Sequence, residues 1–283
     1  MTLADIPDLD RLIEQSIAED LGNGDHSALA CIPESAIGKA HLLVKDDGVL
    51  AGVELAERIF KKVDKRFELD ILIRDGSPVK KGDIAFYVEG PSQKLLTAER
   101  LVLNFMQRLS AIATQTSLYV KLLEGTNTKI LDTRKTTPGL RYLEKWAVTV
   151  GGGYNHRIGL FDMIMLKDNH IDFAGGIAAS IKKTKQYLAQ TGLDLKIEVE
   201  TRNLEEVEQV LCVGGIQRIM LDNFNYADTR TAVKLIAGRY ETESSGGITM
   251  ETIRQYAECG VDFISVGALT HSVKSMDLSL KAI

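Results

Sequence analysis

Six short apolar segments, each followed by an amphipathic or glycine-containing stretch, make up most of the second half of the chain. This alternation predicts a parallel sheet covered by helices, because parallel strands must be joined by long crossover connections. The predicted strands are TKILDT, FDMIMLKD, LKIEVET, IQRIMLDN, YETESSG and VDFISVG, which begin at residues 128, 161, 195, 216, 240 and 261. Such a sheet either curls toward a barrel or stays open and doubly wound.

Polar or small residues stand at the carboxyl ends of these predicted strands. In a β/α barrel those ends meet at one mouth, whereas in an open sheet only the strands beside the switch point share a crevice. Contributions from six strands to one site favour the barrel, and because the strand count falls short of eight, we predict an incomplete barrel of six or seven strands. The strand-end residues are Thr133, Arg134, Lys135, Lys167, Glu200, Asp222, Ser244, Ser245 and Gly267.

The first half of the chain has a different pattern. Residues 36–90 alternate apolar and polar positions between Asp-Gly, Lys-Gly and Gly-Pro turns, and residues 53–65 have helical periodicity, which predicts a small α+β domain with a mixed sheet. A first helix is predicted to begin near Pro7, and a helical pattern over residues 97–125 suggests a bridge between domains. The predicted domains are 1–110, with 272–283 packing on it, and 111–271.

The charge of the chain limits its partners. Lys plus Arg number 34 and Asp plus Glu 39, a balance of −5, and no basic run with interleaved aromatic residues occurs, which argues against nucleic-acid binding. The amino terminus lacks the pattern of a signal peptide, and no apolar run reaches the roughly 18 residues of a membrane span. We therefore expect a cytoplasmic protein in which Cys31, Cys212 and Cys259 are buried, reduced thiols.

Cations nevertheless gather in one stretch of this acidic chain. Arg141 has an alternative explanation as an ion-pair partner of Glu144, and Arg157 as a surface residue. Together the cations are harder to explain in that way, because like charges 4 Å apart repel by about 4 kcal/mol at an effective dielectric constant near 20. A bound anion with several acid groups would offset that repulsion. The clustered cations are Arg134, Lys135, Arg141, His156, Arg157 and Lys167.

Two acidic residues end successive predicted strands. Glu200 and Asp222 should lie side by side at the mouth, where two carboxylates can hold Mg²⁺ or bind sugar hydroxyls. Glu198 lies on the same face of its strand as Glu200, so the choice between them stays open.

Glycines follow the last two strands. The loops containing Ser245, Gly246 and Gly247, and then Gly267 and Ala268, precede predicted helices, the first of which starts near Thr249. Barrels often bind phosphate at these two loops. The triple glycine at 151–153 lacks the spacing of a dinucleotide fingerprint, and a helix stop explains it equally well.

A family resemblance rests on these segments. The stretch DTRKTTPGLRYLEKWAVTVGGGYNHRIGLFDMIMLKDNH, with EVET, LDNF, ESSGGIT and VGALTHS, resembles quinolinate phosphoribosyltransferase. The likeness extends over nearly the whole chain, including EDLGNGDHS and ERLVLNFMQRLSAIAT.

The resemblance implies a fold, an activity and a set of site residues. The fold would be an amino-terminal open α/β sandwich and an incomplete α/β barrel, in a homodimer or larger assembly whose sites are shared between subunits. The activity would be phosphoribosyl transfer from phosphoribosyl pyrophosphate to quinolinate with loss of CO₂. Arg100 would reach the partner's site, Thr133 would bind substrate, and Lys135 and the glycine loops would hold phosphates. The quinolinate carboxylates would be held by Arg134, His156, Arg157 and Lys167, and the ribose and Mg²⁺ by Glu200 and Asp222.

Three alternatives predict different chemistry. A related pyrophosphorylase-like protein of molybdenum transport would share the barrel without the full set of cations. A Schiff-base aldolase would use Lys167 as its nucleophile. A non-catalytic nucleotide-binding regulator would bind ligands without releasing pyrophosphate or CO₂.

Overall fold

The computed structural model describes residues 1–283, and the chain forms two compact units. The first unit comprises residues 1–117, 137–152 and 272–283, and the second comprises residues 118–136 and 153–271. The predicted boundary at residues 110 and 111 falls inside a single long helix, α4 (Ser92–Leu122). A helix has no natural break at such a point, because each turn is hydrogen-bonded to the next.

The first unit contains a four-stranded antiparallel sheet in the order β12-β1-β5-β3. Its strands are β1 (Ile37–Val44), β3 (Glu68–Ile71), β5 (Ile84–Pro91) and β12 (Leu278–Ala282). The carboxyl-terminal strand β12 therefore pairs with β1, far away in the sequence. A second, two-stranded sheet joins β2 (Gly48–Val49) to β4 (Pro78–Val79).

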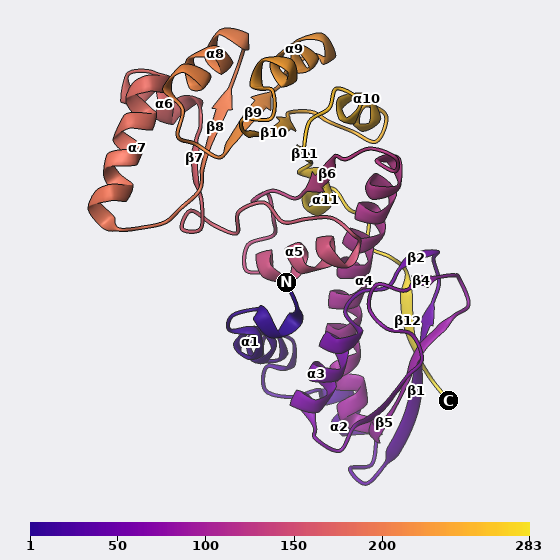
Figure 1. Ribbon diagram of the computed structural model, residues 1–283. Helices are drawn as coiled ribbons and strands as arrows, with labels where there is room; N and C mark the ends of the chain where they lie inside the picture. The colour runs from indigo at the N-terminus through magenta and orange to yellow at the C-terminus, as the bar shows by residue number, and fades with distance from the viewer. The chain divides into compact units, whose positions relative to one another are not determined.

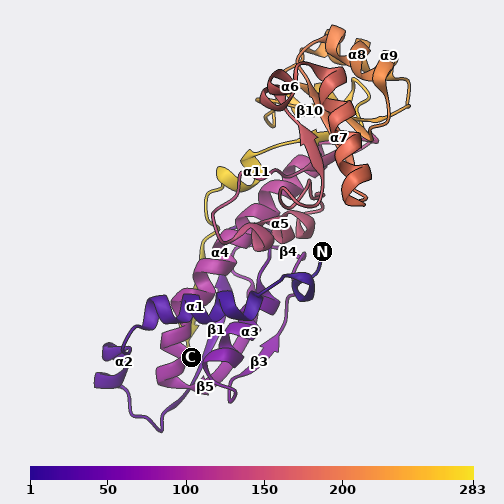
Figure 2. The same ribbon diagram turned by 90° about the vertical axis from the view of Figure 1, so that its left-hand side faces the viewer.

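Helices accompany this sheet. They are the 3₁₀ turn Leu3–Asp5, α1 (Leu9–Leu21), α2 (His26–Cys31), α3 (Val53–Val63), the first part of α4, and α5 (Arg141–Val150). Helix α1 packs against α3 (Figure 2). Helix α3 buries Ala56, Ile59 and Phe60, and its first N–H groups donate to the carboxylate of Asp75. That distant residue thus takes over the capping role that the N-cap glycine cannot perform.

The second unit contains a six-stranded parallel sheet, which confirms all six predicted strands. They are β6 (Lys129–Leu131), β7 (Ile164–Leu166), β8 (Ile197–Thr201), β9 (Arg218–Asp222), β10 (Glu241–Ser245) and β11 (Phe263–Ser265). Their order in the sheet is β6-β11-β10-β9-β8-β7. Strands β7 to β11 follow one another as they do in a barrel, and the first strand pairs with the last, so the sheet is a barrel left open between β6 and β7. The incomplete barrel is confirmed.

Helices cover the outer face of this sheet (Figure 1). They are α6 (Asp168–Ala174), α7 (Ile177–Thr191), α8 (Leu204–Val213), α9 (Tyr226–Ile236) and α10 (Ile253–Ala257). The short helix α11 (Ala268–His271) follows the carboxyl end of β11 instead. Helices α7, α8 and α9 pack in sequence order against one another. Because they cover one face, the other face of the sheet is the interior of the open barrel.

Several local predictions were wrong. Helix α10 begins at Ile253 instead of near Thr249, because Thr249 and Thr252 first close a hydrogen-bonded turn. Cys31 and Cys212 are exposed, and only Cys259 is buried, since the first two lie at the ends of helices that meet solvent. Helix α5 has its C-cap at Gly151, which confirms the helix stop predicted for the triple glycine. No helix of the structure combines the length and the apolar character that crossing a bilayer requires.

Candidate active site

A pocket of about 680 Å³ lies at the carboxyl ends of the parallel strands in the second unit. It brings together residues from all six strand ends, as the barrel prediction requires. Arg100 and Arg141 are not among its walls, because Arg100 lies exposed on the part of α4 that belongs to the first unit and Arg141 begins α5 in the same unit. Ser244 is buried and does not line the pocket either. The predicted residues around the pocket are Thr133, Arg134, Lys135, His156, Arg157, Lys167, Glu200, Asp222, Ser245, Gly246, Gly247, Gly267 and Ala268.

The side chains inside the barrel form layers. Alternate residues of a strand share a face, so Glu198 and Glu200 on β8 both point inward. Glu200 lines the pocket, and Glu198 is fully buried one layer below it. Both side chains therefore face the barrel interior, and Glu198 lies deeper than Glu200. The same spacing places Glu243 one layer below Ser245 on β10.

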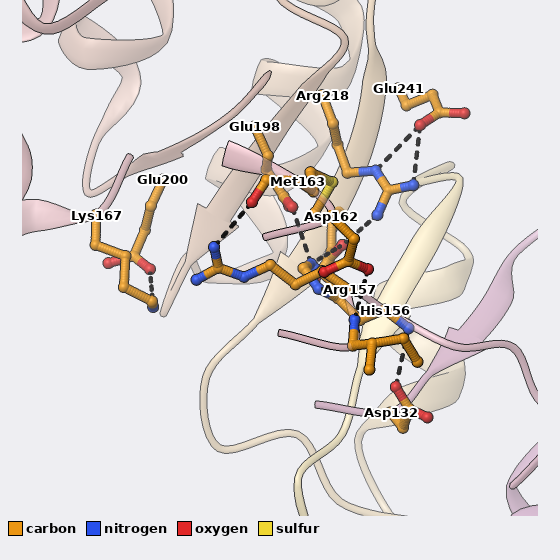
Figure 3. A network of polar contacts seen from close by, with 12 residues as sticks. Asp132, His156, Arg157, Asp162, Met163, Lys167, Glu198, Glu200, Arg218 and Glu241 are labelled. Carbon is orange, nitrogen blue, oxygen red and sulfur yellow. Dashed lines mark hydrogen bonds and ion pairs between the residues drawn. The ribbon is translucent and has the colours of Figure 1, made fainter. Parts of the chain in front are cut away.

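Cations form one wall of the pocket. Arg157 is only 8% exposed, and its guanidinium Nη1 donates to the carbonyl oxygen of Met163 at 3.0 Å (Figure 3). Burial, followed by the nearby charge of Arg134, lowers the pKa of Arg157, while Glu198 opposes that effect. The Nε atom of Arg134 is buried and has no hydrogen-bond partner in the protein. An anionic ligand would supply the acceptor that the Arg134 Nε lacks and would offset the repulsion between the two arginines.

Lys167 follows β7 and forms an ion pair within the pocket. Its Nζ atom lies 2.6 Å from Oε2 of Glu200 (Figure 3). The Lys167 side chain is 45% exposed, so the ammonium also faces the open pocket. Its backbone N–H donates to Nδ1 of His170 at the start of α6, which fixes the residue at the strand end. The ion pair links the cationic wall to the carboxylates.

The carboxylate of Asp222 is held from two sides. Its Oδ1 accepts from the Ser245 hydroxyl at 2.9 Å, and its Oδ2 accepts from the Asn223 amide at 2.7 Å. Asn223 adopts the left-handed backbone conformation, with φ 56°. A side chain at Gly246 would overlap the Asn223 amide, so glycine is required there. These two hydrogen bonds fix the orientation of the Asp222 carboxylate at the pocket.

A charged cluster lies beneath the pocket floor. Glu198 and Glu243 are both fully buried, and burial raises the pKa of each to about 7. Nη1 of Arg218 lies 2.9 Å from Oε2 of Glu243, and His156 lies against both carboxyl groups. Aliphatic residues usually fill this region of a barrel, so the charges are unusual and depend on one another.

Two glycine loops complete the pocket. Gly246 and Gly247 have left-handed φ values of 94° and 59°, which turn the chain sharply after β10. At Gly267 a side chain would meet His271 and Lys135 at 3.0 Å, so the backbone there stays accessible to a ligand. Both loops can therefore present backbone N–H groups to phosphate oxygens.

Both halves of the chain resemble the domains of one known family. Residues 25–110 match the model of the N-terminal domain of quinolinate phosphoribosyl transferase, and residues 112–281 match the model of its C-terminal domain. The chain belongs to the quinolinate phosphoribosyltransferase family. The match to the N-terminal domain precedes the match to the C-terminal domain along the chain.

Relatives of this family member cover almost its whole length. A chloroplastic nicotinate-nucleotide pyrophosphorylase (carboxylating) from Arabidopsis thaliana is 47% identical, over 97% of this chain and 82% of the relative. A probable nicotinate-nucleotide pyrophosphorylase (carboxylating) from Bacillus subtilis is 42% identical, over 96% and 92%. The crystal structure of NadC from Streptococcus pyogenes superposes with a TM-score of 0.92 at 39% identity, over 99% of both chains. The fold is thus that of the family.

Some residues around the pocket of this family member were not predicted. Asn223 directly follows Asp222, and His271 lies within the quoted VGALTHS segment, but neither ends a strand. Glu243 precedes Ser245 by two positions, which was the available signal that it shares the inner face. Strand-end reasoning finds the upper layer of a barrel and overlooks residues that reach the pocket from below or from loops.

Proposed function

We propose that this chain transfers a phosphoribosyl group from phosphoribosyl pyrophosphate to the ring nitrogen of quinolinate, giving nicotinate mononucleotide, pyrophosphate and CO₂. One observation carries the proposal. A single pocket combines a wall of cations, two carboxylates at adjacent strand ends and two glycine loops. Those three parts match a pyridine dicarboxylate, a ribose and phosphate groups, respectively. The names of the relatives from Arabidopsis thaliana and Bacillus subtilis refer to the same activity.

The cationic wall would bind quinolinate. Arg157 and Arg134 offer planar donor groups that fit carboxylates, and Lys167 adds a point charge. Lys135, Thr133 and the backbone of the glycine loops would bind the phosphates of the second substrate. The loop residues are Ser245, Gly246, Gly247, Gly267 and Ala268.

The reaction needs charge stabilisation more than proton transfer. The bond from ribose C1 to the pyrophosphate oxygen breaks while the bond to the ring nitrogen forms, and the ribosyl carbon becomes positively charged. Glu200 and Asp222 lie where they can stabilise that charge, and Lys135 and Lys167 where they can neutralise phosphates and carboxylates. The alkylated, cationic ring then accepts the electron pair left at C2 when CO₂ departs, and a proton takes its place. Positioning by the pocket contributes much of the rate.

We further propose that Glu200 and Asp222 hold Mg²⁺ together with substrate phosphates. The residues fit this ion, because each carboxylate oxygen has two lone pairs and the Asp222 hydrogen bonds use only one on each. Bound Mg²⁺ would neutralise the leaving pyrophosphate. The buried group of His156, Glu198 and Glu243 also has ligand atoms within 4.8 Å of one another, but Arg218 already supplies a positive charge there.

The Schiff-base alternative has less support. An aldolase lysine must have its amine free to attack a carbonyl, whereas the Lys167 Nζ is paired with the Glu200 carboxylate at 2.6 Å. A cytoplasmic location stays a prediction. The names of several plant relatives include the word chloroplastic or mitochondrial.

A product assay tests the function. Incubating the protein with quinolinate, phosphoribosyl pyrophosphate and Mg²⁺ should release nicotinate mononucleotide, pyrophosphate and CO₂ in equal amounts, measured by chromatography and by labelled carboxylate. Nicotinate should be a poor substitute, because it lacks the second carboxylate that the cationic wall would bind. Equal turnover of nicotinate would contradict the proposed substrate, and absence of product from both would contradict the proposed reaction.

We also propose that the chain works as a homodimer in which Arg100 enters the site of the partner subunit. Arg100→Ala and Arg157→Ala should each be nearly inactive alone. Dissociated and reassociated as an equal mixture, they should recover about one quarter of wild-type activity, because half of the dimers then contain one intact site of two. The control is a mixture of Arg157→Ala with Arg134→Ala, which would stay inactive. Failure of the first mixture to recover, with mixed dimers shown by mass spectrometry, would rule out a shared site.

A further inference from the structure

His156 lies at the floor of the pocket, and both nitrogens of its ring are engaged within the protein. Nδ1 lies 2.7 Å from the backbone nitrogen of Arg157, and Nε2 lies 2.9 Å from Oε2 of Glu198 and 3.6 Å from Oε2 of Glu243 (Figure 3). A backbone N–H can only donate, so Nδ1 must be the acceptor and Nε2 must carry the hydrogen. The imidazole is therefore a neutral donor to the buried carboxyl groups in this arrangement.

The backbone around His156 is fixed as well. Its N–H donates to Oδ1 of Asp132 at 2.9 Å, and Oδ2 of Asp132 accepts from the Asn155 amide at 2.6 Å. Arg157 is thus held at its backbone by the His156 ring and at its guanidinium by the Met163 carbonyl oxygen. Two fixed ends leave the long arginine side chain with little rotational freedom before a ligand arrives.

The carboxyl groups under His156 are anchored in turn. Arg218 contacts Glu243 through Nη1 and Glu241 through Nη2, both at 2.9 Å, and its guanidinium also lies over the ring of Phe263. The network therefore runs across strands β8, β9 and β10 up to the backbone of Arg157. Each member is buried or held by more than one contact, which makes the floor rigid.

We propose that His156 is a positioning residue whose neutral imidazole connects the Arg157 backbone to Glu198 and Glu243, and so aims the Arg157 guanidinium at a carboxylate of the pyridine substrate. This inference rests on the proposed function. It replaces the prediction that His156 itself binds quinolinate as a cation, because neither ring nitrogen points to a free ligand position while both bonds are kept. Of the charged groups near His156, Glu198 and Glu243 lie at its ring, Asp132 accepts from its backbone N–H, and Arg218 pairs with Glu243.

Variants of His156 separate positioning from direct binding. His156→Gln keeps a donor near the position of Nε2, His156→Asn keeps an acceptor near the position of Nδ1, and His156→Ala keeps neither. We expect the KM for quinolinate to rise about 10-fold or more in the alanine variant and less in the two amides, with the KM for phosphoribosyl pyrophosphate unchanged in all three. Thermal melting checks that each variant is folded. Equal defects in all three folded variants, or a rise in both KM values, would overturn the positioning role.

The pH dependence of KM gives a second and independent readout. A histidine that bound quinolinate as a cation would lose its charge as the pH rises through about 6.5, and the KM would then rise. We expect wild type and His156→Gln, which is uncharged at every pH, to show parallel profiles of KM for quinolinate between about pH 5.5 and 8. A rise in wild type that the glutamine variant lacks would show that His156 binds substrate directly.

The protonation state can also be measured without any substrate. Nitrogen-15 NMR of the free protein near neutral pH, with His156→Gln used to assign the signals, should show the tautomer with hydrogen on Nε2. A doubly protonated His156 ring near neutral pH would contradict the proposal even if the chain turned over quinolinate. Absence of quinolinate turnover in wild type, with the expected tautomer present, would instead contradict the proposed function.

Discussion

Replacing Arg157 by alanine is expected to reduce kcat/KM for quinolinate at least about 100-fold while the protein remains folded. The guanidinium is nearly buried, and truncating one partner of a desolvated, charge-assisted contact removes about 3 kcal/mol of binding. Most of the loss should appear in the KM for quinolinate, because Arg157 lies in the cationic wall and away from the glycine loops. Steady-state kinetics with each substrate varied in turn measures the change.

Two further variants sharpen this experiment. Arg157→Lys keeps the charge but loses the planar pair of donors, so it should recover only part of the lost affinity. Arg66→Ala removes an exposed arginine that pairs with Asp64 in the first unit, and it should behave as wild type. If Arg157→Ala kept its affinity for quinolinate, the cationic wall would not be the binding site.

Replacing Asp222 by asparagine should lower kcat about 100-fold or more and leave the KM for quinolinate nearly unchanged. The carboxylate is held at the pocket by Ser245 and Asn223, and the amide has similar shape without the charge. Removing one preorganised charge from the place where positive charge develops costs about 3 kcal/mol in the transition state. Single-turnover kinetics distinguishes this effect from slower product release.

A matched control for this variant is Asp228→Asn on α9. Asp228 is half-buried, accepts a hydrogen bond from the Asn225 side chain and lies outside the pocket, so its loss should not change kcat. Titration with Mg²⁺ adds a second readout, since Asp222→Asn should need a higher Mg²⁺ concentration for half-maximal activity. An unaltered kcat in Asp222→Asn would remove Asp222 from the chemistry.

The sequence alone was sufficient to identify the residues in the upper layer of the barrel, at the ends of its strands. Parallel strands are short, apolar and separated by helices, so their ends could be read from the alternation, and residues such as Lys167, Glu200 and Asp222 were found there. The same reasoning predicted phosphate loops after the last two strands, and both lie at the pocket. These features depend on local periodicity and chain order, which a sequence records directly.

Other features needed contacts between distant segments. Burial of Glu198 and Glu243 beneath the pocket depends on how β8 and β10 are placed beside β9, and the cap of α3 depends on Asp75 from a different loop. The order of the strands also decided between an open sheet and an incomplete barrel, because both produce the same alternation along the chain.

His156 shows the difference between what the sequence indicates and what the tertiary structure adds. Its residue type and its place among cations suggested a charged ligand for quinolinate. In the tertiary structure the ring instead lies between one backbone donor and two carboxyl groups, and from this arrangement we infer a neutral, positioning imidazole. The sequence thus determined which groups are present at the mouth of the barrel, since strand ends follow from periodicity. Only the tertiary structure decided how these groups are oriented and paired, because both depend on hydrogen-bond partners that come from other strands.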